Sequence, residues 1–535
     1  MSKSTILIRQ CMISRPRRVS TSSSGRSSTS PQRHSVAAPA VVPSYKRFSD
    51  IPGPIALPLM KYHEHVLPRI GCYHHAVGLG LLDSLRDKYG NLVRLGKSSR
   101  KRPVLYVFDP ELMREVYNSN ATESPVWSGS PLEVQRYTRC PTNRDEVKAI
   151  WSALQIILQD GTLQKSYERA FNEIAEDFLR RISELRHAEN ALNEEVNTEV
   201  YRWALETISV MMFGIRLGCL DGPVHVPSDN NRRPEKTSMD DDIKDLCSLS
   251  QRHLDDLTPA EQLVRCSLEI ADENYLVRSE GTLRSETQRF KNAVTAFDRH
   301  FSLTEYFLTK AQMQLDNGEI RPEQILFDKL KPLGDKMLPV AADVLLAGID
   351  PLAQTALSMF YQLSMQPAQQ QRAHDEIVWS KASKDAGEEA NELPYITACI
   401  REAMRLKPVT GGVVRRSKED LVVDGYEIPA GVDIVLAHGV SSKTEEEWGR
   451  AKSFIPERWC NSSAPIKASR AHSFASLPFG QSCPATGIVG QMLTSLATRT
   501  LDKYRLEWHG PQPKLVTSGV NKLQPPYYFV LQNAS

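Results

Sequence analysis

Apolar residues recur along most of the chain with the period of an α-helix. From about residue 145 to 215 this periodicity dominates, and YERAFNEIAEDFLRRI carries an apolar stripe on one helix face: Phe171, Ile174, Phe178 and Ile182. A polar segment at residues 222–245 predicts a loop, and long helical stretches then continue to about residue 407. The pattern predicts a mainly helical protein.

Strand patterns are shorter. DSLRDKYGNLVRLG predicts a helix that ends at Gly90 and a strand after it, and PVLYVFDPELMREVY predicts a strand, a turn and a helix. LVVDGYEIPAGVDIVLA alternates in polarity around Asp424-Gly425, which predicts a hairpin. Because we find no internal repeat and no clear linker, we expect one predominantly α domain with a minor β-sheet region (α+β) over residues 46–535.

Composition and charge narrow the functional classes. The formal net charge is +2, so no strong overall field favours nucleic acid as a partner. The nine cysteines are scattered and include no Cys-x-x-Cys pair, which argues against a secreted disulfide framework and a zinc ribbon. We find no run of about 18 apolar residues and therefore predict no membrane-spanning helix.

The first 45 residues have a composition of their own. No Asp or Glu precedes Asp50, whereas arginine and serine are abundant. An acid-poor, Arg-rich and Ser-rich start is typical of a mitochondrial transit peptide, and the alternative is a disordered basic tail. We expect residues 1–45 to be the targeting segment.

Glu402 and Arg405 lie three residues apart on one predicted helix. Such pairs are common, and most are exposed and contribute about 0.2–0.5 kcal/mol. The sequence that follows is more specific, because LPYITACIREAMRLKPVTGGVVRRSKEDLVVDGYEIPAGVDIVLAHGVSSKTEEEWGRAKSFIPERW runs through helix, proline turn, arginines and hairpin to a Pro-Glu-Arg segment. This stretch closely resembles the cytochrome P450 superfamily, especially its mitochondrial clan. The resemblance implies that Glu402, Arg405 and Arg458 form a buried triad behind a haem.

Further matches extend this resemblance over nearly all of residues 46–535. DVLLAGIDPLAQTALSMFYQL resembles the family's central helix over the haem, in which Ala347, Gly348 and Asp350 fit the pattern. Small residues there let a substrate or dioxygen approach the helix backbone. RFSDIPGPIALPL and YRWALETISVMMFGIRLGCLDG are similar to the family's proline-rich start and to a mid-chain helix of mitochondrial members.

The resemblance also implies a metal ligand. A cysteine thiolate holds the haem iron in this family, and Cys483 lies 81 residues after Glu402 and 25 after Arg458, about where that ligand is expected. The alternative is a buried, inert thiol. The propionates of haem b need cationic partners, and Arg415 matches the family's arginine after the proline turn.

Two motifs that serve the haem depart from the family pattern. The ligand loop, usually Phe-x-x-Gly-x-Arg-x-Cys-x-Gly, reads LPFGQSCPATG, with Gln481 where an arginine is expected and Ala485 where a glycine is expected. The early-helix motif Trp-x-x-x-Arg is replaced by Val147 and Trp151, with Lys148 nearby.

The central helix departs as well. Pro351 and Leu352 follow Asp350 where the family has an alcohol that helps to deliver protons during oxygen activation. Thr355 lies one turn later and is the candidate substitute. We expect Asp350 and Thr355 to be the catalytic residues. The altered motifs fit a divergent catalyst, a degenerate protein of this fold, or a mis-assembled sequence.

The resemblance implies a haem-thiolate monooxygenase with haem b bound through Cys483. It would oxidise a lipophilic substrate, sterol-like or xenobiotic, with O2 and electrons from a ferredoxin. The expected location is the mitochondrial matrix, with peripheral contact to the inner membrane as a further expectation. The alternative is a protein of this fold that binds a ligand or partner without turnover.

Overall fold

The computed structural model describes most of the chain in thirteen stretches. These are residues 45–54, 79–95, 102–123, 144–186, 191–192, 195–221, 257–280, 288–317, 325–385, 393–460, 466–478, 483–518 and 520–534. The expected targeting segment up to residue 44 and the expected loop at 222–245 lie outside them.

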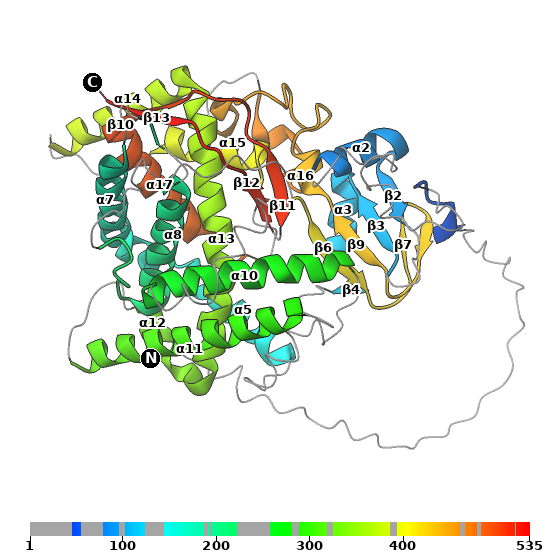
Figure 1. Ribbon diagram of the computed structural model, residues 1–535. Helices are drawn as coiled ribbons and strands as arrows, with labels where there is room; N and C mark the ends of the chain where they lie inside the picture. The colour runs from blue at the N-terminus through cyan, green and yellow to red at the C-terminus, as the bar shows by residue number, and fades with distance from the viewer. Residues whose placement is uncertain are drawn as a thin grey trace, which may run out of the picture.

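Helices dominate the described part of the chain, and most of them gather on one side of the molecule (Figure 1). The α-helices are α2 (Leu79–Tyr89), α3 (Pro110–Asn118), α5 (Arg144–Leu158), α6 (Gly161–Ser166), α7 (Glu168–Leu185), α8 (Glu195–Phe213), α10 (Pro259–Glu280), α11 (Gln288–Asp316), α12 (Ile325–Leu330), α13 (Met337–Ser364), α14 (Pro367–Asp385), α15 (Pro394–Leu406), α16 (His438–Ser441) and α17 (Thr486–Lys503).

The strands form small sheets. They are β1 (Lys46–Arg47), β2 (Leu92–Leu95), β3 (Val104–Val107), β4 (Thr122–Glu123), β5 (Ala191–Leu192), β6 (Val413–Ser417), β7 (Leu421–Val423), β8 (Tyr426–Ile428), β9 (Asp433–Leu436), β10 (Tyr504–Trp508), β11 (Leu515–Ser518), β12 (Val520–Leu523) and β13 (Phe529–Asn533). The largest sheet in the described residues has the order β2-β3-β9-β6-β4, and β11 pairs with β12 as an antiparallel hairpin. The predominantly α fold with a minor β-sheet region is confirmed.

Local chemistry explains several boundaries that the sequence predicted. The Asp109 carboxylate accepts hydrogen bonds from two backbone N–H groups at the start of α3, which fixes that helix start. Gly90 follows α2 with a φ of 92°, a conformation that favours glycine. Asp424 and Gly425 both have positive φ, 48° and 72°, as a tight turn between β7 and β8 requires.

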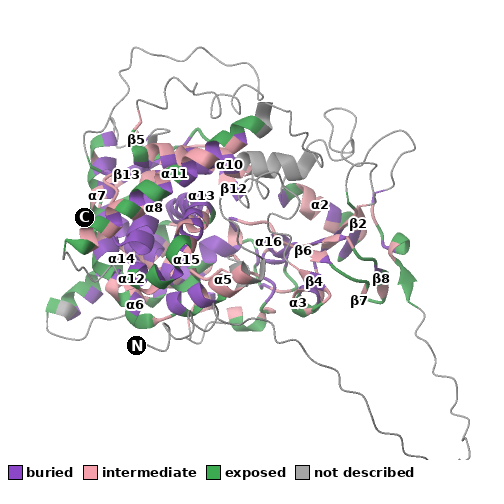
Figure 2. Cartoon of the chain, turned by 90° about the horizontal axis from the view of Figure 1, so that it is seen from below, coloured by how far each residue is buried: buried purple, intermediate pink, exposed green. Residues whose placement is uncertain are grey.

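Helix α13 forms the centre of the helical side, where it packs against α8, α10, α11 and α15 (Figure 2). It is buried along most of its length and belongs to the main hydrophobic core. The stretch Ile325–Ser364 is long and apolar enough to cross a membrane by composition, but most of it is buried inside the protein. Its apolar character is therefore explained by its place in the core.

Candidate functional site

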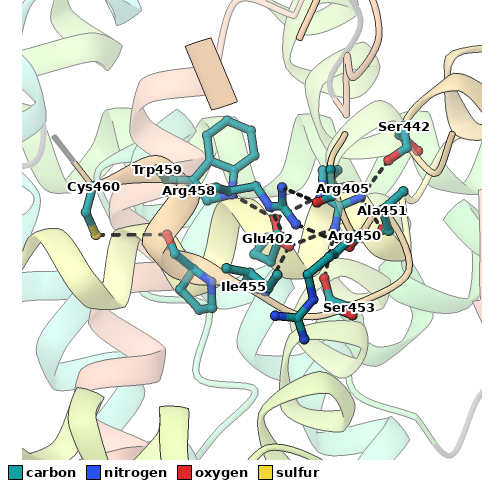
Figure 3. A network of polar contacts seen from close by, with 12 residues as sticks. Glu402, Arg405, Ser442, Arg450, Ala451, Ser453, Ile455, Arg458, Trp459 and Cys460 are labelled. Atoms are coloured by element: carbon teal, nitrogen blue, oxygen red, sulfur yellow. Dashed lines mark hydrogen bonds and ion pairs between the residues drawn. The ribbon is translucent and has the colours of Figure 1, made fainter. Parts of the chain in front are cut away.

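The predicted triad is present and fully buried (Figure 3). The Glu402 carboxylate accepts hydrogen bonds from Arg405 Nε and Nη2 at 2.9 and 2.7 Å and from Arg458 Nε at 3.0 Å. Trp459 Nε1 and the N–H of Ile455 donate to the same carboxylate at 2.9 and 3.0 Å. All three charged side chains are 0% exposed, so α15 and the 3-10 turn Pro456–Trp459 are joined by one charge cluster.

Two arginines and one glutamate leave this cluster with a net positive charge, which the surroundings compensate. The guanidinium groups donate to five backbone carbonyl oxygens, those of Ser442, Ala451, Ser453, Gly449 and Arg450. The guanidinium carbons of Arg405 and Arg458 also lie 5.2 and 5.9 Å from the centre of the Trp448 ring. Such saturation is what makes a buried charge cluster tolerable.

One stripe of α13 is open although the rest of the helix is buried. Between Val340 and Ser364 the residues that are exposed or half-buried recur about one turn apart: Asp343, Val344, Ala347, Gly348 and Pro351. Ala347 is exposed, and its methyl group is too small to cover the backbone. This stripe therefore offers a flat molecule or a substrate close access to the helix.

Gly348 also lies where α13 approaches α8. A Cβ atom at this position would lie 2.9 Å from Ile208 Cδ1 of α8. The glycine therefore allows α8 and α13 to pack closely, while Ala347 provides the open surface.

The two expected catalytic residues lie on α13 with different surroundings. The Asp350 carboxylate accepts a hydrogen bond from the Tyr201 hydroxyl of α8 at 2.5 Å and lies 3.1 Å from Lys522 Nζ of β12. The Thr355 hydroxyl donates to the carbonyl oxygen of Pro351 at 2.7 Å. Thr355 is therefore tied to the open stripe, whereas Asp350 contacts the neighbouring elements.

Cys483 lies three residues before α17 and is half-buried. The pKa of its thiol is raised, mainly by burial, and the nearby Ala485 N–H and Thr486 hydroxyl offset this rise only in part; the Thr486 hydroxyl donates to the Cys483 carbonyl oxygen at 3.2 Å. The N-terminal end of a helix also favours negative charge on a nearby group. These features suit a thiolate ligand for iron.

Cys483 differs in this respect from the other cysteines that the structure describes. Burial raises the pKa of each of those thiols, and carboxylates raise it further: Glu206 at Cys219, Glu269 at Cys266, and Glu457 with Glu376 at both Cys399 and Cys460. Among the residues that the structure describes, no carboxylate acts on the pKa of Cys483. Among these five residues, Cys483 is thus the best candidate for a thiolate.

Arg415 of β6 is the predicted propionate partner. It donates from Nε and Nη2 to the side chain and the carbonyl oxygen of Thr122, at 3.1 and 3.0 Å. Burial lowers the pKa of its guanidinium group, which nevertheless stays charged near neutral pH. Two of its N–H groups donate to Thr122, and its guanidinium carbon lies 5.1 Å from the centre of the Tyr117 ring.

The residues present fit a haem. Cys483 supplies a thiolate-forming group, Arg415 a cation for a propionate, and the open stripe of α13 a surface without bulky side chains. Gln481 and the side chains of Val147 and Lys148 lie outside the described residues, while Trp151 packs against the main core. The expected weakening of haem contacts at these positions stays a prediction.

Sequence reasoning missed the partners of the charged residues. Tyr201 and Lys522 stand 149 and 172 residues from Asp350, and no spacing rule connects them. Trp448 and Trp459, which contact the triad, could have been suspected from the sequence. Each stands within a few residues of an arginine in the same segment.

Comparisons with known proteins agree with this geometry. The sequence profile of the family described as Cytochrome P450 matches residues 64–531. "Probable cytochrome P450 49a1" and "Probable cytochrome P450 301a1, mitochondrial", both from Drosophila melanogaster, are 25% and 26% identical to this chain. Their alignments cover 92% and 88% of it and 83% and 84% of those proteins. "Cytochrome P450 12b1, mitochondrial" from Drosophila acanthoptera is 22% identical, over 89% of this chain and 88% of that one.

The solved structures extend the likeness to the fold. The "Crystal structure of cytochrome P450DA heme domain" has a TM-score of 0.67 at 16% identity. The superposition covers 90% of this chain and 97% of that one.

Proposed function

The chain belongs to the cytochrome P450 family, and on this basis we propose that it is a haem-thiolate monooxygenase that oxidises a lipophilic substrate. The cofactor of this family and fold is haem b. Residues 46–535 would form the haem-thiolate domain. A sterol-like or xenobiotic compound is the substrate class that the family resemblance favours.

The electrostatic setting of Cys483 carries this proposal. Cys483 lies three residues before α17, the Thr486 hydroxyl donates to its carbonyl oxygen at 3.2 Å, and no carboxylate among the described residues raises the pKa of its thiol. When bound, the haem would activate O2 for insertion of one oxygen atom into the substrate. Cys483 would hold the iron, and Arg415 would neutralise a propionate.

The Thr355 hydroxyl is proposed to deliver protons beside the open stripe during oxygen activation. Its hydroxyl donates to the Pro351 carbonyl, so its two lone pairs can accept a hydrogen bond from water. To pass on its own proton, the hydroxyl must rotate away from that carbonyl oxygen. Proton delivery would therefore be slower than from an alcohol without this bond.

The location and the electron donor are proposed from the relatives. Several of them carry the word mitochondrial in their names, and residues 1–45 have the composition of a transit peptide. A ferredoxin is the matching electron donor, and Arg401 on α15 is exposed and basic. Sequencing the N-terminus of the protein from its own cells tests the targeting claim, which an intact Met1 would reject.

A protein of the same fold without turnover is the second candidate. The observation that favours it is Pro351, which occupies the position of the expected alcohol and has no N–H or hydroxyl to offer.

The carbon monoxide difference spectrum of the reduced protein tests the main proposal. We expect the thiolate-haem band in the unmodified protein and in Cys460→Ser, and its loss in Cys483→Ser. Retention of the band in Cys483→Ser would reject the ligand assignment. A haem-loaded protein that forms no product from any lipophilic compound, with ferredoxin and its reductase present, would support the second candidate.

A further inference from the structure

A buried polar cluster joins α8, α13 and β12. The Tyr201 hydroxyl donates to Asp350 Oδ1 at 2.5 Å and accepts a hydrogen bond from Gln354 Nε2 at 3.0 Å. Lys522 Nζ lies 3.1 Å from Asp350 Oδ2, with side-chain exposures of 19% and 3%. Gln354 Oε1 accepts a hydrogen bond from the backbone N–H of Leu523 at 3.1 Å. Asp350 and Gln354, one turn apart on α13, therefore both contact β12.

The Asp350 side chain projects from a different side of α13 than the open stripe. At about 100° per residue, Asp350 lies about 60° around the helix from Ala347 and about 100° from Pro351. Its carboxylate contacts Tyr201 of α8 and Lys522 of β12, so it interacts with these two elements and points away from the open stripe. Breaking one partner of such a buried pair leaves the other charge without compensation.

The β11–β12 hairpin is also held on its other side. The N–H of Asn521 donates to the Val409 carbonyl oxygen at 2.7 Å, and its side-chain amide donates to the Pro408 carbonyl oxygen at 2.8 Å. Residues 408 and 409 follow α15 and precede β6, which carries Arg415. The hairpin is thus held between the turn of α13 that carries Pro351 and the segment that leads to the proposed propionate partner.

We propose that Asp350, through its ion pair with Lys522, is a positioning residue that fixes the β11–β12 hairpin at the edge of the open stripe of α13. In this role Asp350 selects substrates by setting the width of the space beside the stripe, in place of the proton-donating role that the family resemblance implies. The proposal rests on the proposed function for its substrate part. Its structural part, the link between Asp350 and the hairpin, concerns the protein with or without haem.

Three variants test this role: Lys522→Met, Asp350→Asn and the double variant. Hydrogen–deuterium exchange of residues 515–523 should rise about tenfold or more in Lys522→Met, because the hairpin loses its ion pair with Asp350 and keeps the Gln354 contact with α13. Asp350→Asn should also raise exchange, because it removes the carboxylate that pairs with Lys522. The double variant should exchange more slowly than Asp350→Asn, because the Lys522 charge is removed together with its partner.

Arg416→Met is the matched control. It breaks the Arg416–Asp433 pair, whose side-chain exposures of 17% and 23% are similar, between β6 and β9. Exchange of residues 515–523 should stay unchanged in this variant.

Ligand binding by the haem-loaded protein tests the substrate part. Spectral titrations with cholesterol and with 4-phenylimidazole should show that Lys522→Met changes the two dissociation constants by different factors, at least threefold apart. Substrate selection by the hairpin is overturned if both constants stay unchanged while exchange rises.

Two outcomes separate this proposal from the proposed function. If no haem binds to the unmodified protein, the proposed function fails, and the exchange experiment still decides the role of Asp350. If haem binds but Lys522→Met leaves exchange unchanged, and the double variant is as impaired as Asp350→Asn, the positioning role is overturned.

Discussion

Two regions of the molecule bury charged side chains in different ways. The Glu402–Arg405–Arg458 triad satisfies its carboxylate with five hydrogen bonds and its guanidinium groups with five carbonyl oxygens. The Asp350–Lys522 pair, whose carboxylate also accepts a hydrogen bond from the Tyr201 hydroxyl, borders an open stripe and joins α13 to β12. The triad fixes a scaffold, whereas a pair beside open space joins parts whose relative position matters for binding.

Removing the centre of the saturated cluster should have the largest effect. Glu402→Ala leaves two buried arginines without their carboxylate, and we expect the free energy of unfolding to fall by about 3–5 kcal/mol. Urea denaturation measures this loss. Glu111→Ala is the control, since it breaks the exposed Glu111–Arg114 pair at the same spacing, together with a contact to His472, and should destabilise the protein far less. Equal effects of the two variants would show that burial of the triad does not matter.

The second-largest expected effect is a loss of folding stability at acidic pH, through a buried histidine that contacts α13. His300 on α11 contacts Ser267 of α10 and the Ala342 carbonyl oxygen of α13, and burial lowers its pKa to about 4. Between pH 6.5 and 4 the unfolded chain binds a proton that the folded chain does not, so stability falls as the pH falls through this window. The loss is on the order of 3 kcal/mol for this group.

Stability measured at several pH values checks this, with His300→Gln as the comparison. The variant should show a shallower dependence between pH 6.5 and 4. Some dependence should remain, because burial also lowers the pKa of His438 to about 4. An unchanged slope in His300→Gln would contradict the assignment.

A hydroxyl restored at position 351 of the open stripe should change the ratio of product to peroxide, which is a smaller effect than the losses of stability above. Pro351→Thr returns a hydroxyl next to Asp350, and we expect the ratio of product to peroxide to rise several-fold, since a positioned proton donor speeds such steps. Product, peroxide and NADPH consumption are measured with a ferredoxin chain. If the unmodified protein already wastes few electrons as peroxide, the missing alcohol is unimportant.

The smallest effect concerns the surface of α15, the helix that carries the triad inside. Arg401→Glu reverses an exposed charge, and we expect ferredoxin affinity to fall a few-fold at low salt, with a flatter salt dependence. Arg169→Glu on α7 is the control, because Arg169 is also highly exposed. Binding that is equal in both variants across salt concentrations would remove Arg401 from the docking surface.

The family resemblance implied the triad, because its members lie in one continuous and specific motif. Glu402 and Arg405 share a helix turn, a spacing that is common and uninformative by itself, and Arg458 follows in a short proline-led segment. Helix periodicity likewise predicted α7, whose residues Phe171 and Phe178 are buried on one face.

Long-range partners could not be predicted in this way. Gly348 has the spacing of a substrate-facing residue, and its close approach to Ile208 of α8 could not be read from that spacing. The pairing of Asp350 with Lys522 depends on how β12 crosses α13, which is a property of the folded chain. Periodicity reports faces of single elements, and contacts between distant elements require the tertiary structure.

The uneven distribution of carboxylates around the thiols has a consequence for durability. A protein that activates oxygen is exposed to leaked oxidant, and oxidants attack thiolates far faster than thiols. Burial, with a further contribution from Glu457 and Glu376, raises the pKa of Cys399 and Cys460 and keeps both thiols protonated and unreactive. The same setting that makes these two cysteines poor ligands therefore protects the segment around the triad from oxidative damage.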